Sequence, residues 1–382
     1  MSPRDAVICA AVRTPVGVGK PGKGALSDLH AVDLAAIPLR AIIAQTGIDP
    51  AVVDDVFWGC VTQVGEQSFN VGRHAVLSAG FPESVPATTI DRQCGSSQQA
   101  LHFAASTVMS GQADVVIAGG VESMSRMPMG SNMAGGDGPF SPEMQKRYPG
   151  VMFNQGVGAE MIAEKWGLER GYLDGLAVTS HDRAAAATAA GLFRDEIVAV
   201  GDFVDDQGIR PGSNVDKLAT LPTPFKEGGV VSAGNASQIS DGSAALLVTT
   251  SEKAAELGLT PIVRFHTGAV VGSDPVMMLT GPIPATAKVL ERSGLSIDDI
   301  GAFEVNEAFA SVVGAWFAET GADPALTNVN GGAMAIGHPL GASGARLMTT
   351  LVHNMKRTGA RYGLQTMCEG GGMANATVVE LL

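Results

Sequence analysis

Hydrophobic residues follow two alternating patterns along the chain. Over residues 31–46 and 96–110 the apolar positions recur at i, i+3 and i+4, which predicts amphipathic helices. Short β-branched runs at 6–12, 53–58 and 114–118 instead predict buried strands. Many of the 49 glycines stand at the ends of these runs, as they do in the strand-to-helix turns of α/β proteins. The alternation predicts an α/β fold whose strands are buried.

The alternation is interrupted between about residues 119 and 235. This part begins with a stretch at 124–129 that is rich in methionine and continues with two helical segments, around 158–166 and 172–190. We interpret it as a loop domain inserted into the α/β fold.

Two pairs of segments repeat at nearly the same displacement along the chain. Two adjacent aspartates precede a predicted strand, the second of them being Asp55 in one copy and Asp299 in the other. A glycine follows a predicted helix at Gly111 and again at Gly359. The displacements are 244 and 248 residues. We infer two similar α/β halves that face each other with the active site between them. The first half comprises residues 1–258 with the loop domain at about 119–235, and the second comprises 261–382.

Charge and composition exclude several classes of protein. The 382 residues contain 25 Lys and Arg against 38 Asp and Glu, and the formal net charge of −13 repels nucleic-acid phosphates and anionic membranes. No apolar stretch reaches the ~18–20 residues of a membrane span. The apolar run at 6–12 follows Asp5 and lacks a signal-peptide cleavage site. We therefore expect a cytoplasmic protein with no nucleic-acid and no membrane partner.

Common cofactor motifs are missing or incomplete. The segment Gly17-Val-Gly-Lys-Pro-Gly satisfies a dinucleotide-binding pattern, but prolines flank and occupy it and no helix is predicted directly after it. None of the four cysteines is in CxxC spacing, so we expect reduced thiols and neither a disulfide scaffold nor a bound metal. These cysteines are Cys9, Cys60, Cys94 and Cys368.

Two of the cysteines occupy positions that suit chemistry. Cys94 lies where a strand pattern meets the helix predicted from Ser96, and the positive end of a helix dipole favours a nucleophilic thiolate. Cys368 precedes three glycines, whose backbone N–H groups can approach a ligand closely. The alternatives are a small buried hydrophobic residue for Cys94 and a simple tight turn after Cys368.

A histidine and an asparagine complete the candidate chemistry. His338 is flanked by glycines and followed by proline, which indicates a rigid loop, and its imidazole is a plausible base for a thiol. Asn306 follows a predicted strand at 302–305 and precedes a helix predicted from Glu307, so helix capping is the strong alternative for its side chain.

Six motifs, in order along the whole chain, together resemble the thiolases, the acyl-CoA C-acetyltransferases. They are Cys94-Gly-Ser, Gly119-Gly-Val-Glu-Ser-Met-Ser, Ala233-Gly-Asn-Ala-Ser-Gln-Ile-Ser-Asp-Gly, Asn306-Glu-Ala-Phe-Ala, Gly337-His-Pro-Leu-Gly and Cys368-Glu-Gly-Gly-Gly. The resemblance implies the thiolase fold, in which two repeated α/β halves form a five-layered αβαβα core with an inserted loop domain.

The resemblance also implies roles for individual residues. Cys94 is expected to be the acylated nucleophile, His338 the base that activates it, and Cys368 the acid/base at the α-carbon of the acetyl unit. Asn306 is expected to hold a water that binds the thioester oxygen together with His338. The expected second oxyanion hole consists of the backbone N–H groups of Cys94 and Gly370.

The same resemblance implies the ligands and the assembly. Arg210, Ser237 and Ala308 match family positions that line the coenzyme A groove. Coenzyme A is expected as a co-substrate with no bound cofactor and no metal, and the chain is expected to form a homodimer or homotetramer.

Departures from the family pattern bear on the substrate. Asp91 and Ser97 differ from the usual residues around the nucleophile, and Asn154 stands where short-chain biosynthetic enzymes have a loop-domain histidine. Together with motif details similar to actinobacterial 3-ketoacyl-CoA thiolases, these differences favour degradation of 3-ketoacyl-CoA to acetyl-CoA and a shortened acyl-CoA, in fatty acid or sterol β-oxidation. The alternative is a biosynthetic acetoacetyl-CoA thiolase.

Two further classes are less favoured. A β-ketoacyl synthase of the same fold pairs one cysteine with two histidines or with a histidine and an asparagine, so the second thiol, Cys368, argues against it. A non-catalytic acyl-CoA-binding protein has no need for Cys94, His338, Asn306 and Cys368 together, and equilibrium binding without turnover would support that alternative.

Overall fold

A computed structural model describes residues 4–382 of the chain. Its strands are β1 (Val7–Arg13), β2 (Gly17–Val18), β3 (Asp55–Gly59), β4 (Thr88–Ile90), β5 (Val115–Ser123), β6 (Ser240–Thr249), β7 (Val263–Gly272), β8 (Ala302–Val305), β9 (Tyr362–Glu369) and β10 (Met373–Leu381). Its helices are α1 (Ala31–Thr46), α2 (Val71–Ser78), α3 (Ser96–Ser110), α4 (Pro142–Arg147), α5 (Gln155–Trp166), α6 (Arg170–Ala189), α7 (Val215–Ala219), α8 (Ser251–Glu256), α9 (Pro282–Ser293), α10 (Ala310–Thr320) and α11 (Ser343–Thr358).

The strands form two half-sheets with the same internal order. The first runs β4-β3-β5-β6-β1 and the second runs β7-β10-β9-β8. In the first half, β3 and β5 are parallel, and the antiparallel strand β6 pairs with β5 on one side and with β1 on the other. In the second half, β8 and β9 are parallel, and the antiparallel strand β10 pairs with β9 on one side and with β7 on the other. The two half-sheets are linked by a short antiparallel pairing of β1 with β7, at Val7 and Ile8.

Helix ends repeat in the same way. The helices α1 and α9 end at Gly47 and Gly294, and α3 and α11 end at Gly111 and Gly359. All four glycines have φ between 70 and 77°, the left-handed conformation that glycine adopts without strain. The predicted repeat is therefore confirmed in both strand order and helix termination.

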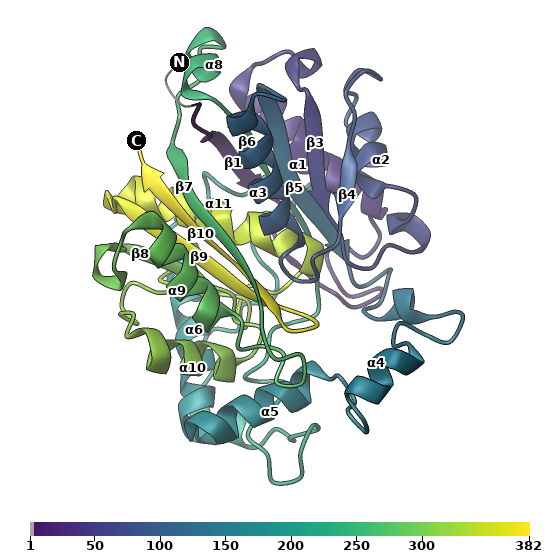
Figure 1. Cartoon of the computed structure of the whole chain (residues 1–382), viewed down its shortest axis with the longest axis vertical. Coiled ribbons are helices and arrows are strands. Elements are labelled where there is room, and N and C mark those ends of the chain that lie inside the picture. Colours follow the sequence, from purple (N-terminus) through teal and green to yellow (C-terminus); the bar gives the residue numbers. More distant parts are fainter. Residues whose placement is uncertain (1–3) are drawn as a thin grey trace.

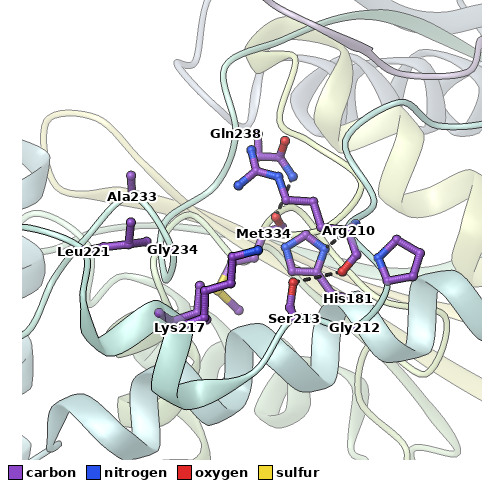
Figure 2. Close-up of a pocket in the computed structure, with 12 residues that line it drawn as sticks. His181, Arg210, Gly212, Ser213, Lys217, Leu221, Ala233, Gly234, Gln238 and Met334 are labelled. Atoms are coloured by element: carbon purple, nitrogen blue, oxygen red, sulfur yellow. Dashed lines mark hydrogen bonds between the residues drawn. The ribbon is translucent and has the colours of Figure 1, made fainter.

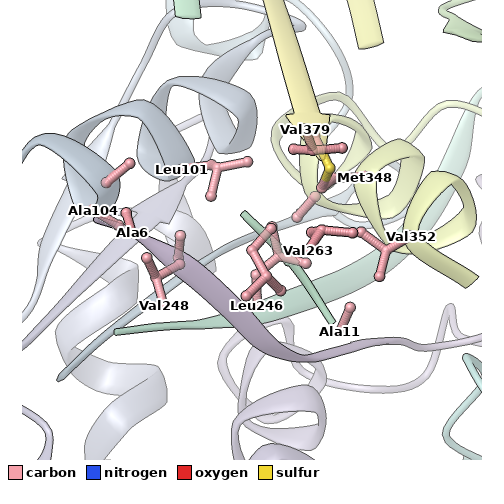
Figure 3. Packing of buried hydrophobic residues seen from close by; sticks show 14 of the residues in the cluster. Ala6, Ala11, Leu101, Ala104, Leu246, Val248, Val263, Met348, Val352 and Val379 are labelled. Atoms are coloured by element: carbon pink, nitrogen blue, oxygen red, sulfur yellow. The ribbon is translucent and has the colours of Figure 1, made fainter. Parts of the chain in front are cut away.

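Five layers result from the way the helices cover the two half-sheets (Figure 1). The outer face of the first half-sheet packs against α1 and α2, and that of the second packs against α9 and α10. Between the half-sheets lie α3 and α11, which contact each other. Figure 3 shows this central layer, in which Leu101 and Ala104 of α3, Met348 and Val352 of α11, and Leu246 and Val263 of the strands share one buried cluster. The predicted αβαβα order is confirmed.

The inserted segment lies between β5 and β6 and contains α4 to α7. Because β5 continues to Ser123, the predicted start of the loop domain at 119 falls inside a strand. The helices α5 and α6 pack against α10, below the second half, whereas α4 lies at the periphery (Figure 1). The predicted boundary between the halves at 258–261 falls in the connection from α8 to β7, and the division into domains there stays a prediction.

Residues 4–382 contain neither a helix suited to span a membrane nor a cluster of side chains suited to hold a metal ion. None of the helices there combines the length and the apolarity needed to cross a membrane. The same residues contain no cluster of three or more His, Cys, Asp or Glu side chains arranged to hold a metal ion.

Candidate active site

Four predicted site residues come together from four separate elements. Cys94 lies just before α3, Asn306 follows β8, His338 lies in the loop before α11, and Cys368 is near the end of β9. All four are at most 4 % exposed. Cys94 packs in a small apolar cluster with Leu340, two residues after His338, and with Met367, the neighbour of Cys368. The nucleophile predicted from sequence therefore lies against both the histidine loop and the second cysteine strand.

Hydrogen bonds define the tautomer of His338. The Ser343 hydroxyl donates its only proton to the Pro339 carbonyl at 2.8 Å, and the same oxygen lies 2.5 Å from Nδ1 of His338. Ser343 must therefore accept from Nδ1–H, which leaves Nε2 as the unprotonated nitrogen. Burial, and then the charge of Arg346, lower the pKa of His338 to about 3, so the imidazole is neutral. A neutral ring with a free Nε2 is suited to accept a proton.

Asn306 does not cap a helix, contrary to the alternative raised by its sequence position. The following helix, α10, begins at Ala310 with Phe309 at its N-cap, three residues later than predicted. Residues 306–309 lie outside the helix, and the Glu307 carboxylate there accepts hydrogen bonds from Ser180 and Asn328. The Asn306 amide is thus free to face the histidine, with Nδ2 3.4 Å from Nε2 of His338.

The Cys94 thiol is protonated in the resting site. Burial, and then the charge of Glu369, raise its pKa to about 12, whereas the backbone N–H groups of Cys94 and Gly370 act in the opposite direction by hydrogen bonding to the sulfur. The thiolate expected from the helix dipole is therefore wrong for this state. A base would have to remove this proton before the sulfur could act as a nucleophile, and the N–H groups of Cys94 and Gly370, the predicted oxyanion hole, both lie at the sulfur.

The second thiol lies in an apolar cluster of its own. Cys368 packs with residues of the α5, α9 and α10 regions, among them Met278 and Phe309. Burial raises its pKa well above the usual range, and the charges of Cys94 and Glu369 raise it further. Because Cys94 packs against Met367, the neighbour of Cys368, both thiols lie at one site.

Glu122 is an element of the site that the sequence analysis did not identify as functional. Its fully buried carboxylate accepts hydrogen bonds from the backbone N–H groups of Val61, Thr62 and Gly341 and from the Gln67 amide, all at 2.8–2.9 Å. It thereby connects the loop after β3, which contacts Cys94 through Val61, with the loop that carries His338. The signal in the sequence is an acidic residue within the otherwise apolar strand β5.

A cavity of about 150 Å³ lies beside the histidine loop. Its lining includes the predicted residue Arg210 together with Lys217 and His181, which Figure 2 shows close together. His181 accepts the backbone N–H of Arg210 through Nδ1, and burial, with the charge of Arg210, lowers its pKa to about 4. The cavity therefore offers two cationic side chains beside a neutral histidine, and only Arg210 was anticipated.

One residue of the cavity wall contacts the catalytic loop directly. The backbone carbonyl of Gln238 accepts the N–H of His338 at 3.1 Å, and its side-chain amide donates to the carbonyls of Met334 and Ala335 at 2.8 and 3.0 Å. The other two predicted groove residues, Ser237 and Ala308, are joined by a backbone hydrogen bond of 2.9 Å and lie next to the cavity lining rather than in it.

Comparison with known proteins agrees with this architecture. Residues 6–252 match the family model "Thiolase, N-terminal domain" and residues 259–381 match "Thiolase, C-terminal domain". The chain is 50 % identical to a steroid 3-ketoacyl-CoA thiolase of Mycobacterium tuberculosis, over 99 % of this chain and 94 % of that protein. It is 44 % identical to a 3-ketoacyl-CoA thiolase of Escherichia coli, over 98 % of each chain.

A solved structure gives the same result for the fold. The acetyl-CoA acetyltransferase of Bacillus anthracis superposes with a TM-score of 0.90 at 37 % identity, over 99 % of each chain. The family, the fold class and the acyltransferase activity predicted from the motifs are thus confirmed. With both family domains matched over nearly all of its length, the chain belongs to the thiolase family of acyltransferases.

Proposed function

We propose that this thiolase cleaves 3-ketoacyl-CoA with free coenzyme A, giving acetyl-CoA and an acyl-CoA two carbons shorter. The observation that carries the proposal is a neutral His338 with an unprotonated Nε2 in a buried site that holds two thiols. The relatives named 3-ketoacyl-CoA thiolases support the degradative direction. The proposed setting is fatty acid or sterol β-oxidation, and the reverse reaction is a Claisen condensation.

In the first half-reaction, Cys94 attacks the 3-keto carbon of the substrate. Its proton passes to Nε2 of His338 as the sulfur–carbon bond forms, because the resting thiol is protonated. The backbone N–H groups of Cys94 and Gly370 then stabilise the negative oxygen of the adduct. When the bond between C2 and C3 breaks, its electron pair stays on C2 as an enolate, and Cys368 donates a proton to C2. The products are acetyl-CoA, an acyl-Cys94 thioester and a Cys368 thiolate.

The second half-reaction transfers the acyl group to coenzyme A. The Cys368 thiolate takes the proton of the incoming thiol, and the coenzyme sulfur attacks the acyl-Cys94 carbonyl. His338 and Asn306, through a water, stabilise the oxygen of the acetyl-CoA enolate in the first half, and the backbone N–H groups of Cys94 and Gly370 stabilise the oxygen of the tetrahedral adduct on Cys94 in both halves. His338 returns its proton to the Cys94 sulfur as the sulfur leaves, so every proton is accounted for.

We place the coenzyme A phosphates against the cationic cavity. Arg210 and Lys217 line this cavity. Although the chain has a net charge of −13, the cavity is therefore locally positive and favours an anionic ligand. Ser237 and Ala308 lie between this cavity and the cysteines, where a pantetheine arm would pass. Coenzyme A acts as a co-substrate, with no bound cofactor and no metal.

The acyl side of the site favours large apolar groups. Asn154 stands where short-chain biosynthetic enzymes have a histidine. Its side-chain oxygen caps α5 by accepting hydrogen bonds from the N–H groups of Gly156 and Val157. The adjacent Phe153 joins the apolar cluster of Cys368 with Met277. Of the methionines in this region, Met124 and Met278 are buried in these clusters, Met277 is partly buried against one of them, and Met129 is 55 % exposed.

We further propose that the chain forms a homodimer or homotetramer and is located in the cytoplasm. In the described residues β4 is the outer strand of the first half-sheet, and a second copy could cover its unpaired backbone groups.

The test is turnover of a panel of 3-ketoacyl-CoA esters, short, medium and ring-bearing, with free coenzyme A as acceptor. We expect kcat/KM for a medium or cyclic ester to exceed that for acetoacetyl-CoA by about 10-fold or more, which needs only ~1.4 kcal/mol of additional transition-state binding. A preference for acetoacetyl-CoA would favour the biosynthetic alternative. Binding of every ester without turnover would overturn the proposed enzyme activity altogether.

A further inference from the structure

Aromatic residues in the segment between β5 and α5 have no role in the proposed chemistry. Residues 135–150 of this segment surround α4 at the periphery of the molecule (Figure 1). Their hydrogen bonds within the described chain stay local, such as those that Gln145 donates to the carbonyls of Phe140 and Ser141, both at 3.0 Å. None of these residues belongs to one of the buried apolar clusters of residues 4–382. Another kind of contact must therefore attach the segment to the protein.

Two aromatic contacts provide this attachment, and both are made to Phe153. The ring centroid of Phe140 lies 5.2 Å from that of Phe153, with the planes tilted by 31°. The ring of Tyr148 lies 5.5 Å from that of Phe153, edge to face, at an interplanar angle of 80°. Both distances are typical of favourable aromatic pairs. Phe153 therefore holds one ring that precedes α4 and one that follows it.

Phe153 also connects the α4 segment with the reacting groups. It packs against the buried apolar cluster that contains Cys368 and Phe309. A second aromatic contact leads outward from the same cluster, because Phe225 lies 6.3 Å from Phe309 in a T-shaped arrangement. Phe140 and Phe225 are each 37 % exposed, whereas Phe309 is buried. Aromatic rings thus extend from the neighbourhood of Cys368 to the surface near the start of α5.

Glycines at both ends leave the α4 segment free to adjust. Gly135, Gly136 and Gly138 precede the helix and Gly150 follows it, and all four have φ between 54 and 104°. An added Cβ would meet no atom within 4 Å at any of them, so no side-chain packing fixes these turns. With few contacts beyond the two rings on Phe153, the segment can shift to accommodate a ligand at a small cost in free energy.

The size of the acyl group decides whether it can reach these rings. Acetoacetyl-CoA has only a methyl group beyond the 3-keto carbon that Cys94 attacks, so it ends within the buried site. A larger acyl group extends outward along the apolar cluster of Cys368, toward Phe153 and the rings that it holds. Aromatic rings present flat apolar faces, and a flat ring system buries more area against them than a flexible chain end does.

We propose that Phe140 and Tyr148 are specificity-determining residues, which together with Phe153 form an aromatic wall that binds ring-bearing acyl groups on the acyl side of the site. The wall contributes to the binding of a fused-ring ester and contributes nothing to that of acetoacetyl-CoA. This inference rests on the proposed function and names the residues that select its substrate.

The first experiment measures kcat/KM for acetoacetyl-CoA and for a 3-ketoacyl-CoA that carries a naphthyl group at the end of its chain. In Phe140→Ala and in Tyr148→Ala we expect the value for the naphthyl ester to fall by about 10-fold, and that for acetoacetyl-CoA to stay within about 2-fold of wild type. Tyr148→Phe keeps the ring and is expected to behave like wild type. The matched control is Phe103→Ala, because Phe103 is 42 % exposed and has one edge-on aromatic contact, 6.2 Å from Phe57, outside the cluster of Cys368.

The second experiment detects binding without turnover. Trypsin cleaves after Lys146 and Arg147, which are exposed on α4, and the fragments are identified by mass spectrometry. Naphthylpropionyl-CoA, which lacks a 3-keto group, should slow this cleavage at least about 3-fold in wild type, because it adds contacts that hold the segment in place. Acetyl-CoA should give no protection. The double variant of Phe140→Ala with Tyr148→Ala should lose the protection by the naphthyl ester.

Three results would overturn the inference. They are an equal fall in kcat/KM for both esters, an unchanged value for the naphthyl ester in both alanine variants, and equal tryptic cleavage of wild type with and without naphthylpropionyl-CoA. If wild type cleaves no 3-ketoacyl-CoA at all, the proposed function fails, and the tryptic protection still tests the aromatic wall because it depends on binding alone.

Discussion

Replacing Glu122 by alanine should destabilise the protein strongly, although the residue touches no substrate in the proposed mechanism. The carboxylate accepts four hydrogen bonds of 2.8–2.9 Å from groups on two separate segments, the connection after β3 and the loop that carries His338. Alanine leaves the four donors buried without an acceptor, at a cost of ~1 kcal/mol or more each. The expected loss is about 4 kcal/mol, a large part of the ~5–15 kcal/mol that stabilises a typical protein.

A graded series makes this prediction specific. Oε1 accepts from Thr62 and Gln67, and Oε2 accepts from Val61 and Gly341. Glu122→Gln retains one oxygen, and therefore two of the four bonds, so it should lose roughly half as much stability as Glu122→Ala.

The assay is urea unfolding followed by circular dichroism, with thiolysis measured in parallel. Glu164→Ala is the matched control, because Glu164 forms an exposed ion pair with Lys226 and should tolerate the same substitution without measurable change. Because Glu122 also fixes Gly341, next to the histidine loop, kcat should fall in both Glu122 variants. If Glu122→Ala unfolds at the same urea concentration as Glu164→Ala, the carboxylate does not hold these segments together and the reasoning is refuted.

Three further predictions concern the chemistry. Cys94→Ala should show no acyl-enzyme adduct by intact-protein mass spectrometry after exposure to substrate, and an adduct in this variant would place the nucleophile elsewhere. Cys368→Ala should still be acylated at Cys94 by a simple acyl-CoA yet lose carbon–carbon cleavage by ~10²–10⁴-fold, the usual contribution of a positioned acid/base; near-normal thiolysis would remove Cys368 from the mechanism. Lys217→Ala should raise KM for coenzyme A by about 10-fold with little change in kcat, and the rise should be smaller at high salt. The control Lys226→Ala should leave KM unchanged. Equal effects of the two substitutions would argue against the cationic cavity as the phosphate site.

Local patterns in the sequence were sufficient to predict much of the fold. The helix predictions for 31–46 and 96–110 coincide with α1 and α3, because the apolar spacing is regular and a glycine ends each helix. The strand predicted at 302–305 coincides with β8 for a similar reason, since its residues are all buried. These elements depend on information within a few residues, which a single sequence contains.

Long-range effects account for the errors. The thiolate predicted for Cys94 relied on a helix dipole worth ~0.3–1 kcal/mol. Burial by distant segments raises the pKa from 9.0 to about 12, which corresponds to roughly 4 kcal/mol and decides the protonation state. The late start of α10 likewise depends on contacts of Glu307 with Ser180, which is 127 residues away. Glu122 went unnoticed because its hydrogen-bond partners lie on similarly distant segments.

The strand order of the two half-sheets constrains the sequence of events during synthesis. In the first half-sheet β6 lies between β5 and β1, and in the second β10 lies between β9 and β7. Each of these two strands is the last of its half to appear in the chain. During synthesis on the ribosome, β1 therefore cannot pair with β6 until the whole inserted segment has been made. In the same way, β7 cannot pair with β10 until the end of the chain has been made. Cys94 emerges more than 240 residues before His338, so a nascent chain carries an unassembled nucleophile for most of its synthesis. A chaperone that shields the early strands should accordingly be needed most while residues 124–239 are being translated.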